Sequence, residues 1–370
     1  MVVVPSWNKQ GGFYYGEKPL FAVQGDVHCW TKVKSLLREL PQDAEHNPGL
    51  VGHVDFDGNF WFGFYPELQS FKKKKELLGF VQKKINSKNL CSAPPVFVSD
   101  TDRERYASMV LQAKDYIASG DIYVINLARE MTCPWEGDPL ALLGFFLEGG
   151  RGLEGICYID DGPKTLVCAS PEMFLRIEGN KLESKPIKGT RPRSDRRPEN
   201  RRNLLDLVQS EKEKAELLMI TDLVRNDFGK VCAYGSVRVP HLRRLSSHPH
   251  LYHMHSKVEG IIAFRYDKVD AFLANFPGGS VTGTPKKRAI ELIRELEIHP
   301  RGSYSGAIGY FQPAGAAFTM SIRLVEIEEK KARFWVGSGI TFDSDPYAEY
   351  EETEQKAIFI KTALENCAKK

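Results

Sequence analysis

The chain carries the heptapeptide Lys185-Pro186-Ile187-Lys188-Gly189-Thr190-Arg191. Its central lysine, Lys188, lies between a proline that restricts the backbone and a glycine that permits more conformations. Pro186 fixes its own φ and has no amide hydrogen. Gly189 can adopt conformations that a side chain forbids. Such a frame holds an amine in one place, as a nucleophile or an anion ligand requires. An exposed β-turn has the same local pattern, so the heptapeptide indicates function only together with other motifs.

The composition is that of a soluble globular protein of 370 residues, enough for one large domain or two ordinary ones. The net charge of +3 is too small to indicate binding to nucleic acid or to a membrane. Seven cysteines without a CxxC pair favour free thiols in a reducing compartment. The N-terminus has no basic region followed by a long apolar run. We therefore expect a cytoplasmic protein without membrane association.

Short alternating apolar runs predict a β-rich N-terminal portion over residues 1–95, followed by a larger portion over 96–370. A connector is expected at Ser92-Ala93-Pro94-Pro95. Because hairpin signals are frequent, antiparallel sheets are favoured over a doubly wound parallel sheet, and the expected class is α+β. Helices are predicted over 103–119, 140–147, 198–225, 268–274, 285–296 and 346–368. Asp345 is the expected N-cap of the last of these helices.

Two of these helices each carry a pair of glutamates at i,i+3, a spacing that places both on one helix face. The pairs are Glu213 with Glu216 and Glu349 with Glu352. Four carboxylates from two helices could hold Mg²⁺, which takes few protein oxygens together with water and substrate oxygens. A solvated helix edge, with each glutamate paired to a neighbouring lysine, fits the same spacing. The sequence does not show whether the two helices meet.

Two glycine-rich segments could bring backbone amides close to an anion. Residues 277–286 run into a helix with Thr284 as the expected N-cap, although a well-capped helix without a ligand fits them equally. Gly337-Ser338-Gly339 follows a predicted strand. Arg323, on another predicted strand, could clamp a carboxylate through two N–H groups, or could be an ordinary surface arginine.

Two other clusters suggest functions that their patterns do not support. The histidines at 248, 250, 253 and 255 have neither a zinc-site spacing nor a cysteine nearby. The lysine run 72–75 and the arginines between 191 and 202 suggest a nucleic-acid-binding protein, an alternative of a different class. We disfavour it because these arginines alternate with acidic residues and lack interleaved aromatic residues.

Taken together and in order, the motifs resemble those of the chorismate-utilising enzymes. That family includes anthranilate synthase component I, aminodeoxychorismate synthase component I, isochorismate synthase and salicylate synthase. The resemblance spans residues 100–365 and implies the family fold, with largely antiparallel sheets packed as a sandwich and helices on the outside. The matching motifs are Ser170-Pro171-Glu172, 186–190, 215–217, 222–227, 276–286, 306–310, 337–339 and 349–353 with Lys356.

The resemblance implies a reaction and its cofactor. Lys188 matches a position where aminodeoxychorismate synthases, of the folate branch, characteristically carry lysine and anthranilate synthases usually carry alanine. The lysine amine adds at C2 of chorismate while the C4 hydroxyl leaves, and it is expelled when ammonia enters at C4. Glu172 matches the acid that protonates the leaving hydroxyl. Mg²⁺ neutralises the ring carboxylate, and Glu213, Glu216, Glu349 and Glu352 match its site.

The resemblance also implies which residues hold the substrate chorismate. Two carboxylates on a small ligand need several directed donors. The matching positions are His253, Thr284, Tyr310, Arg323, Gly337, Gly339 and Lys356.

Two departures from the family pattern bear on the choice of branch. Val124 stands where isochorismate and salicylate synthases have a water-activating lysine and other members often have glutamine. The Leu-Leu-Glu-Ser stretch through which anthranilate synthases bind tryptophan is missing from the N-terminal region. We therefore favour aminodeoxychorismate synthase component I, with anthranilate synthase component I as the alternative.

The source of ammonia is implied to be a partner. Class I glutaminases use a cysteine in a Gly-x-Cys-x-Gly elbow, and Gly155-Ile156-Cys157-Tyr158-Ile159 lacks the second glycine. No segment of glutaminase length remains outside the motifs. A separate glutaminase subunit is the expected partner.

Overall fold

The computed structural model describes residues 1–7, 11–40, 49–85, 94–149, 153, 155–194, 196–247 and 251–368. Three features of the sequence analysis lie partly outside the described residues. These are Ser92 and Ala93 of the expected connector, Asp195 within the arginine-rich stretch, and two of the four histidines, His248 and His250.

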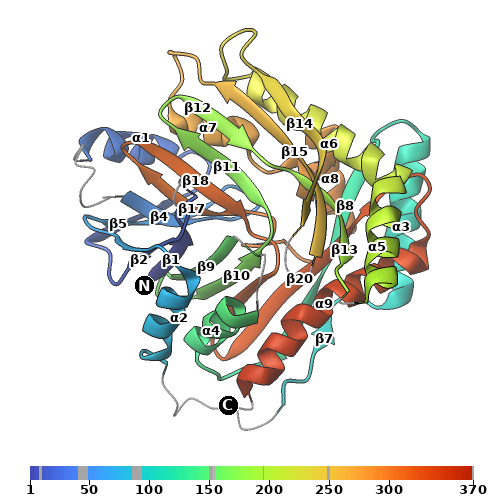
Figure 1. The fold of residues 1–370 in the computed structure, drawn as a ribbon, viewed down its shortest axis with the longest axis horizontal. Helices are drawn as coiled ribbons and strands as arrows, with labels where there is room; N and C mark the ends of the chain where they lie inside the picture. The colour runs from blue at the N-terminus through green and yellow to red at the C-terminus, as the bar shows by residue number, and fades with distance from the viewer. Residues whose placement is uncertain are drawn as a thin grey trace.

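Two antiparallel sheets form the body of the fold (Figure 1). In order across the first sheet, the strands are β16 (Gly283–Thr284), β8 (Val124–Pro134), β20 (Lys331–Ile340), β19 (Leu324–Glu328), β10 (Thr165–Ser170), β9 (Gly155–Asp160), β1 (Val2–Pro5), β2 (Phe13–Gly16) and β6 (Gln69–Phe71), with β7 (Val98–Ser99) beside β8. In the second sheet they are β13 (Ile187–Pro192), β15 (Leu251–Ile261), β12 (Lys181–Ser184), β11 (Met173–Glu178), β18 (Gly315–Met320), β17 (Ala307–Gln312), β4 (Gly49–Val54), β5 (Phe60–Tyr65) and β3 (Phe21–Gly25), with β14 (Arg238–Ser247) beside β15.

The sheets pack face to face, and the alternation of side chains along a strand explains how. On β1, Val2 and Val4 belong to the apolar cluster that joins the two sheets, whereas Val3 belongs to the cluster that joins the first sheet to its helices. Successive side chains of a strand point to opposite faces, so a fully apolar strand such as β1 is buried on both. The predicted α+β sandwich is therefore confirmed.

Helices cover the outer faces of both sheets. On the second sheet lie α1 (Trp30–Glu39), α6 (Glu211–Gly229) and α7 (Lys268–Asn275). On the first sheet lie α2 (Lys74–Gln82), α4 (Pro139–Gly149) and α9 (Pro346–Ala368). Against the end of the first sheet formed by β8 and β20 lie α3 (Arg103–Ala118) and α8 (Lys286–Leu296), while α5 (Arg197–Gln209) packs against β13 and β15.

Strands from the first 95 residues belong to both sheets. In the first sheet β1 pairs with β9, and in the second β4 pairs with β17. The boundary expected near residue 95 therefore does not separate one sheet from the other. No helix among the described residues is long and apolar enough to span a membrane. The cysteines that the structure describes are all free thiols.

The helix predicted over 198–225 is two helices, because the chain turns at Ser210. This residue ends α5 and is the N-cap of α6, with an extended backbone at φ −63° and ψ 103°. Its Oγ accepts a hydrogen bond from the amide of Glu213 at 3.3 Å. Serine is a favoured N-cap residue, and the break directs the first turn of α6 separately from α5.

The expected cap at Thr284 is a second correction. Thr284 lies in β16, opposite Val124 of β8, and α8 begins two residues later with Pro285 as its N-cap. The strand pairing holds the threonine backbone in the sheet, so its side chain does not cap the helix. The expected cap of the last helix is confirmed, because Asp345 accepts hydrogen bonds from the amides of Tyr347 and Ala348.

Replacing the cap at Ser210 is expected to destabilise the protein. Ser210→Ala removes the acceptor for the Glu213 amide and should lower the free energy of unfolding by about 1 kcal/mol. Urea denaturation measures the change. Ser210→Thr keeps a hydroxyl at the cap and should recover most of the loss. Equal stability of the alanine variant and the wild type would show that the cap contributes nothing.

Candidate active site

Residues of β13, the start of α6, β20 and α9 line a cavity of about 610 Å³. These elements lie in the right half of Figure 1. The predicted site residues that line the cavity are Glu172, Lys188, Glu213, Glu216, Arg323, Gly337, Gly339, Glu352 and Lys356. The predicted site residues outside its lining are His253, Thr284, Tyr310 and Glu349.

Tyr310 is a correction to the sequence analysis. Its side chain is buried between the two sheets, where its hydroxyl donates to the carbonyl oxygen of Ser6 and its ring meets that of Tyr14 edge-on. The prediction that Tyr310 holds a substrate carboxylate is therefore wrong. Tyr304 lines the cavity instead. The sequence held a signal for it, since Tyr304 comes just before the matched motif at 306–310.

Thr284 and His253 also lie behind the cavity wall. The carbonyl oxygen of Thr284 accepts a hydrogen bond of 2.7 Å from the amide of Tyr123. His253 is buried on β15, and its Nδ1 lies 2.8 Å from the Oγ1 of Thr190, which does line the cavity. The arrangement makes His253 a support for Thr190. It does not provide the direct substrate contacts that were predicted for these two residues.

Lys188 enters the cavity from an irregular part of β13. The register between β13 and β15 shifts between Ile187 and Thr190, which leaves Lys188 and Gly189 outside regular pairing. Gly189 has φ +82°, and a Cβ there would lie 2.8 Å from Leu207 and 3.1 Å from the Glu213 carboxylate. The glycine is therefore required for both its conformation and its space. The Lys188 Nζ lies 3.5 Å from Glu216 Oε2, and the side chain is 17% exposed.

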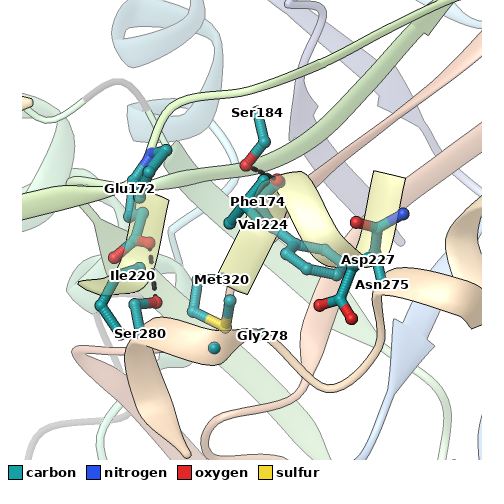
Figure 2. A pocket seen from close by; sticks show the side chains of 12 residues that line it. Glu172, Phe174, Ser184, Ile220, Val224, Asp227, Asn275, Gly278, Ser280 and Met320 are labelled. Atoms are coloured by element: carbon teal, nitrogen blue, oxygen red, sulfur yellow. Dashed lines mark hydrogen bonds between the residues drawn. The ribbon is translucent and has the colours of Figure 1, made fainter. Parts of the chain in front are cut away.

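Glu172 is held in the turn between β10 and β11. Its amide donates a hydrogen bond to Ser170 Oγ at 3.1 Å, and its carbonyl oxygen accepts one from Thr319 Oγ1 at 2.8 Å. The carboxylate accepts a hydrogen bond of 2.8 Å from Ser280 Oγ, drawn as a dashed line in Figure 2. The acid is therefore fixed by its backbone as well as by its side chain.

Apolar side chains lie on one side of Glu172. A space of about 10 Å³, room for about one water, lies behind it. Figure 2 shows Phe174, Ile220, Val224 and Met320 lining this space. Burial raises the pKa of Glu172 to about 7, while the Ser280 hydrogen bond and the Lys188 charge lower it by less. A carboxyl group with this pKa holds a proton near neutral pH and can donate it.

The two helices that carry the glutamate pairs are in contact, which the sequence left open. Lys212 on α6 donates to Glu349 on α9 at 3.3 Å. Each other glutamate also has a basic neighbour. The remaining pairs are Lys188 with Glu216 at 3.5 Å, Arg191 with Glu213 at 3.1 Å, and Lys356 with Glu352 at 2.7 Å.

These ion pairs bear on the predicted Mg²⁺ site. No three of the described histidine, cysteine, aspartate and glutamate side chains gather closely enough to hold a metal ion in this arrangement. The donor set nevertheless fits a hard cation, because it offers carboxylate oxygens from two helices. Glu349 is 4% exposed, and its Oε2 is buried without a hydrogen-bond partner. The lysines supply the positive charge that balances the carboxylates.

Arg191 is engaged inside the protein and does not serve as an open phosphate ligand. Its Nε lies 2.5 Å from Asp206 Oδ2, and its NH1 lies 3.1 Å from Glu213 Oε1. These carboxylates and their hydrogen bonds raise the pKa of Arg191, although burial alone would lower it. The charge of Arg191 is therefore balanced within the protein, which disfavours a role for it in nucleic-acid binding.

Arg323 is a cation in the cavity without an acidic partner among the described residues. Its guanidinium lies over the ring of Phe359, 5.4 Å from the centroid, and burial lowers its pKa. A buried guanidinium without a counter-charge favours an anionic ligand. Its placement fits the predicted carboxylate clamp.

The edge of β20 opens toward the cavity. β19 pairs with β20 up to Phe334, and beyond that point only β8 pairs with it among the described strands. Lys356 Nζ donates to the carbonyl oxygen of Gly337 at 2.9 Å, so this carbonyl points away from β8. In an antiparallel ladder the N–H and C=O of one residue point to the same side. The amides of Gly337 and Gly339 therefore face the open edge.

Tyr304, Trp335 and Asn126 are among the cavity residues that the sequence analysis did not predict. The rings of Tyr304 and Trp335 stack at 6.0 Å with an interplanar angle of 13°, and both line the cavity. Asn126 also lines it, and its Oδ1 is buried without a hydrogen-bond partner. No local pattern marks Asn126 or Trp335, because each is brought to the cavity only by the pairing of β8 with β20.

Cys157 is not placed for nucleophilic catalysis. It lies on β9 within the apolar cluster between the sheets and is fully buried. Burial raises the pKa of its thiol well above the usual value. A reactive cysteine needs a thiolate and access to its substrate, and Cys157 has neither.

The chain was compared with known protein families and with known proteins. A family model for chorismate binding enzymes matches residues 36–362. Anthranilate synthase component 1 of Saccharolobus solfataricus is 38% identical over 264 residues, which cover 71% of this chain and 62% of the relative. Aminodeoxychorismate synthase component 1 of Bacillus subtilis is 36% identical over 270 residues, which cover 73% and 57%. The matched region thus covers less than two thirds of each relative's length.

Two solved structures share the fold. Anthranilate synthase component I from Streptococcus pneumoniae has a TM-score of 0.80 and 22% identity, covering 98% of this chain and 92% of that one. The menaquinone-specific isochorismate synthase from Escherichia coli has a TM-score of 0.78 and 18% identity, covering 98% of this chain and 89% of that one. At these identities the likeness concerns the fold alone.

The raised pKa of Glu172 leads to a prediction about stability and pH. Its ordinary pKa is 4.5, so between 4.5 and about 7 the folded protein keeps a proton that the unfolded chain releases. The free energy of unfolding therefore falls as pH rises through this window. Above the window, the folded protein bears the full cost of ionising the buried Glu172 carboxyl. Glu172→Gln removes the cost, by at most about 3 kcal/mol.

Urea denaturation at pH 5 and pH 8 measures this effect. The stability that Glu172→Gln gains over wild type should be larger at pH 8 than at pH 5. The exposed Glu67→Gln, outside the cavity lining, should show no such difference. If the advantage of Glu172→Gln over wild type were the same at both pH values, Glu172 would not hold a proton in the folded state.

Proposed function

The chain belongs to the chorismate binding enzyme family, and from this premise we propose that it aminates chorismate at C4 to give 4-amino-4-deoxychorismate. This is the reaction expected of an aminodeoxychorismate synthase component I. The observation that carries the proposal is the position of Lys188, whose amine shares the cavity with Glu172 and lies against the open edge of β20. An alanine at this position would leave the cavity without that amine.

The proposed chemistry assigns separate tasks to Lys188 and Glu172. The neutral Lys188 amine forms a bond to C2 of the ring, the ring double bond shifts, and the C4 hydroxyl leaves as water with a proton from Glu172. Ammonia then forms a bond to C4, and the Lys188 amine is expelled from C2. Lys188 must first lose the proton that it holds in its pair with Glu216, and the Glu216 carboxylate at 3.5 Å is a base in position to receive it.

The cavity offers two kinds of contact for the substrate. We propose that Arg323, Lys356 and the amides of Gly337 and Gly339 bind the carboxylates of chorismate. The stacked rings of Tyr304 and Trp335 would form an apolar wall beside the ring. Tyr304 takes the place that the sequence analysis gave to Tyr310.

We propose Mg²⁺ as the cofactor, held by Glu213, Glu216, Glu349 and Glu352. When bound, the ion would neutralise the ring carboxylate and withdraw electron density from the ring. Support comes from the meeting of α6 and α9 at the Lys212–Glu349 contact and from the unpartnered Oε2 of Glu349. A cytoplasmic location stays a prediction from the sequence.

Anthranilate synthesis is the second candidate. Relatives named anthranilate synthase component 1, such as that of Aquifex aeolicus at 34% identity, match over as much as 80% of this chain. The relative named aminodeoxychorismate synthase, at 36% identity, falls among them, so overall identity does not separate the two reactions. The lysine at position 188 favours the reaction that aminates chorismate without making its ring aromatic.

The identity of the product and the role of Lys188 can be measured together. The isolated chain, supplied with chorismate, Mg²⁺ and ammonium, should form 4-amino-4-deoxychorismate by mass spectrometry, without pyruvate. Lys188→Ala should lower the rate by orders of magnitude, because it removes the amine that is proposed to add at C2. Lys185→Ala is the matched control, since Lys185 pairs with Glu183 and does not line the cavity. Anthranilate and pyruvate as products would establish the second candidate.

We further propose that a glutaminase subunit supplies the ammonia. The support is the burial of Cys157 and the naming of the relatives as component 1, which implies a second component. The isolated chain should use ammonium with a rate that increases with pH, because more ammonia is then unprotonated. It should not use glutamine until a glutaminase is added. Release of glutamate from glutamine by the isolated chain, retained in Cys157→Ala, would reveal an unrecognised glutaminase site.

A further inference from the structure

Lys212, in the first turn of α6, lies between the glutamates of α6 and those of α9. We propose that its ammonium group is an internal counter-cation of this acidic cluster and that a divalent metal ion must displace it in order to bind. The proposal rests on the metal site of the proposed function. It assigns Lys212 the task of setting how tightly that site binds metal.

The contact between Lys212 and Glu349 is the first observation. Nζ of Lys212 lies 3.3 Å from Oε1 of Glu349, and the same oxygen accepts a hydrogen bond of 2.7 Å from Ser344 Oγ. The other carboxylate oxygen, Oε2, is buried without a hydrogen-bond partner. A carboxylate that is 4% exposed is costly to ionise unless a cation balances it. Lys212 provides that cation.

The influence of Lys212 extends to both helices. Burial alone would lower its pKa, but the charges of Glu349, Glu216 and Glu352 raise it. The Lys212 charge in turn acts to lower the pKa values of Glu216 and Glu352. Lys212 lines the cavity together with Glu216 and Glu352, and its ammonium group contacts Glu349. It therefore lies in the acidic surroundings that a bound cation would have.

Lys212 differs from the other two lysines of the cluster. The amines of Lys188 and Lys356 have tasks of their own in the proposed reaction. The Lys212 side chain is 50% exposed, and a lysine side chain has a flexible stem that can carry its charge into solvent. It can leave the glutamates without unfolding any element.

Displacement follows from competition for the same oxygens. A metal ion at the carboxylates of Glu216, Glu349 and Glu352 would face the Lys212 ammonium at close range, and like charges repel. Either the metal or the ammonium can balance these carboxylates, so removing the ammonium should tighten metal binding. In the absence of metal, the ammonium balances the buried Glu349.

The test is the affinity of the full chain for Mn²⁺, a paramagnetic probe whose free concentration is read by electron paramagnetic resonance. Lys212→Met keeps the apolar stem and removes the charge. We expect it to bind Mn²⁺ about tenfold more tightly than wild type, which corresponds to about 1.4 kcal/mol. Lys212→Arg should bind no more tightly than wild type. Lys214→Met should match wild type, because Lys214 pairs with Glu211 and does not line the cavity.

Thermal unfolding in EDTA provides a second readout. Lys212→Met should unfold at a lower temperature than wild type, because Glu349 has lost its counter-cation, and saturating Mn²⁺ should remove the difference. If Lys212→Met does not fold in EDTA, Lys212→Gln with Mn²⁺ present during purification replaces it.

The outcomes separate this inference from the metal site itself. Saturable Mn²⁺ binding by wild type that Glu352→Gln weakens, with equal or weaker binding by Lys212→Met, would overturn the role of Lys212 and leave the metal site standing. Absence of Mn²⁺ binding in wild type and in Lys212→Met would overturn both.

Discussion

Charge compensation of the carboxylates on α6 and α9 is the constraint on which the cavity depends. Each of the four glutamates pairs with a lysine or an arginine. Glu349 is buried, so removing its partner would leave a charge in a poorly solvated place, which is strongly destabilising. These ion pairs thereby fix the relative positions of the first turn of α6, the start of α9 and the irregular part of β13. The cavity shape is as much an electrostatic result as a packing result.

The same residue type takes different tasks in this cavity because its surroundings differ. Glu172 has apolar neighbours behind it and one hydroxyl donor, and burial raises its pKa. Burial also acts to raise the pKa of Glu352, but the charge and hydrogen bond of Lys356, together with the charges of Lys212 and Lys188, lower it on balance. One glutamate is thus suited to donating a proton and the other to remaining an anion. The separation of roles does not require any difference in covalent chemistry.

The sequence was most informative where a local pattern and a local structure coincide. The frame around Lys188 and the cap at Asp345 were predicted from neighbouring residues, and the backbone adopts both. Ser210 was overlooked because helix-forming residues continue on both sides of it, so the apolar periodicity concealed the break. Trp335 and Asn126 were missed for another reason. The pairing of β20 with β8 brings them to the cavity, and no short window of sequence contains that pairing. Tyr304 was overlooked although it stands just before a matched motif. Tyr310 was misplaced because a motif match gives no information on which face of a strand points into the cavity.

The pairing of the first strands has a consequence for how the chain assembles. Val54 of β4 lies opposite Ala307 of β17, and Val2 of β1 lies opposite Ile159 of β9. During synthesis, β4 therefore has no partner on that side until β17 (Ala307–Gln312) has left the ribosome. Contacts between distant segments slow folding and leave apolar strands open to wrong partners. The hairpin of β4 and β5 is rich in aromatic residues and would be exposed during that interval. This enzyme should thus depend on chaperones during translation more than its compact final form suggests.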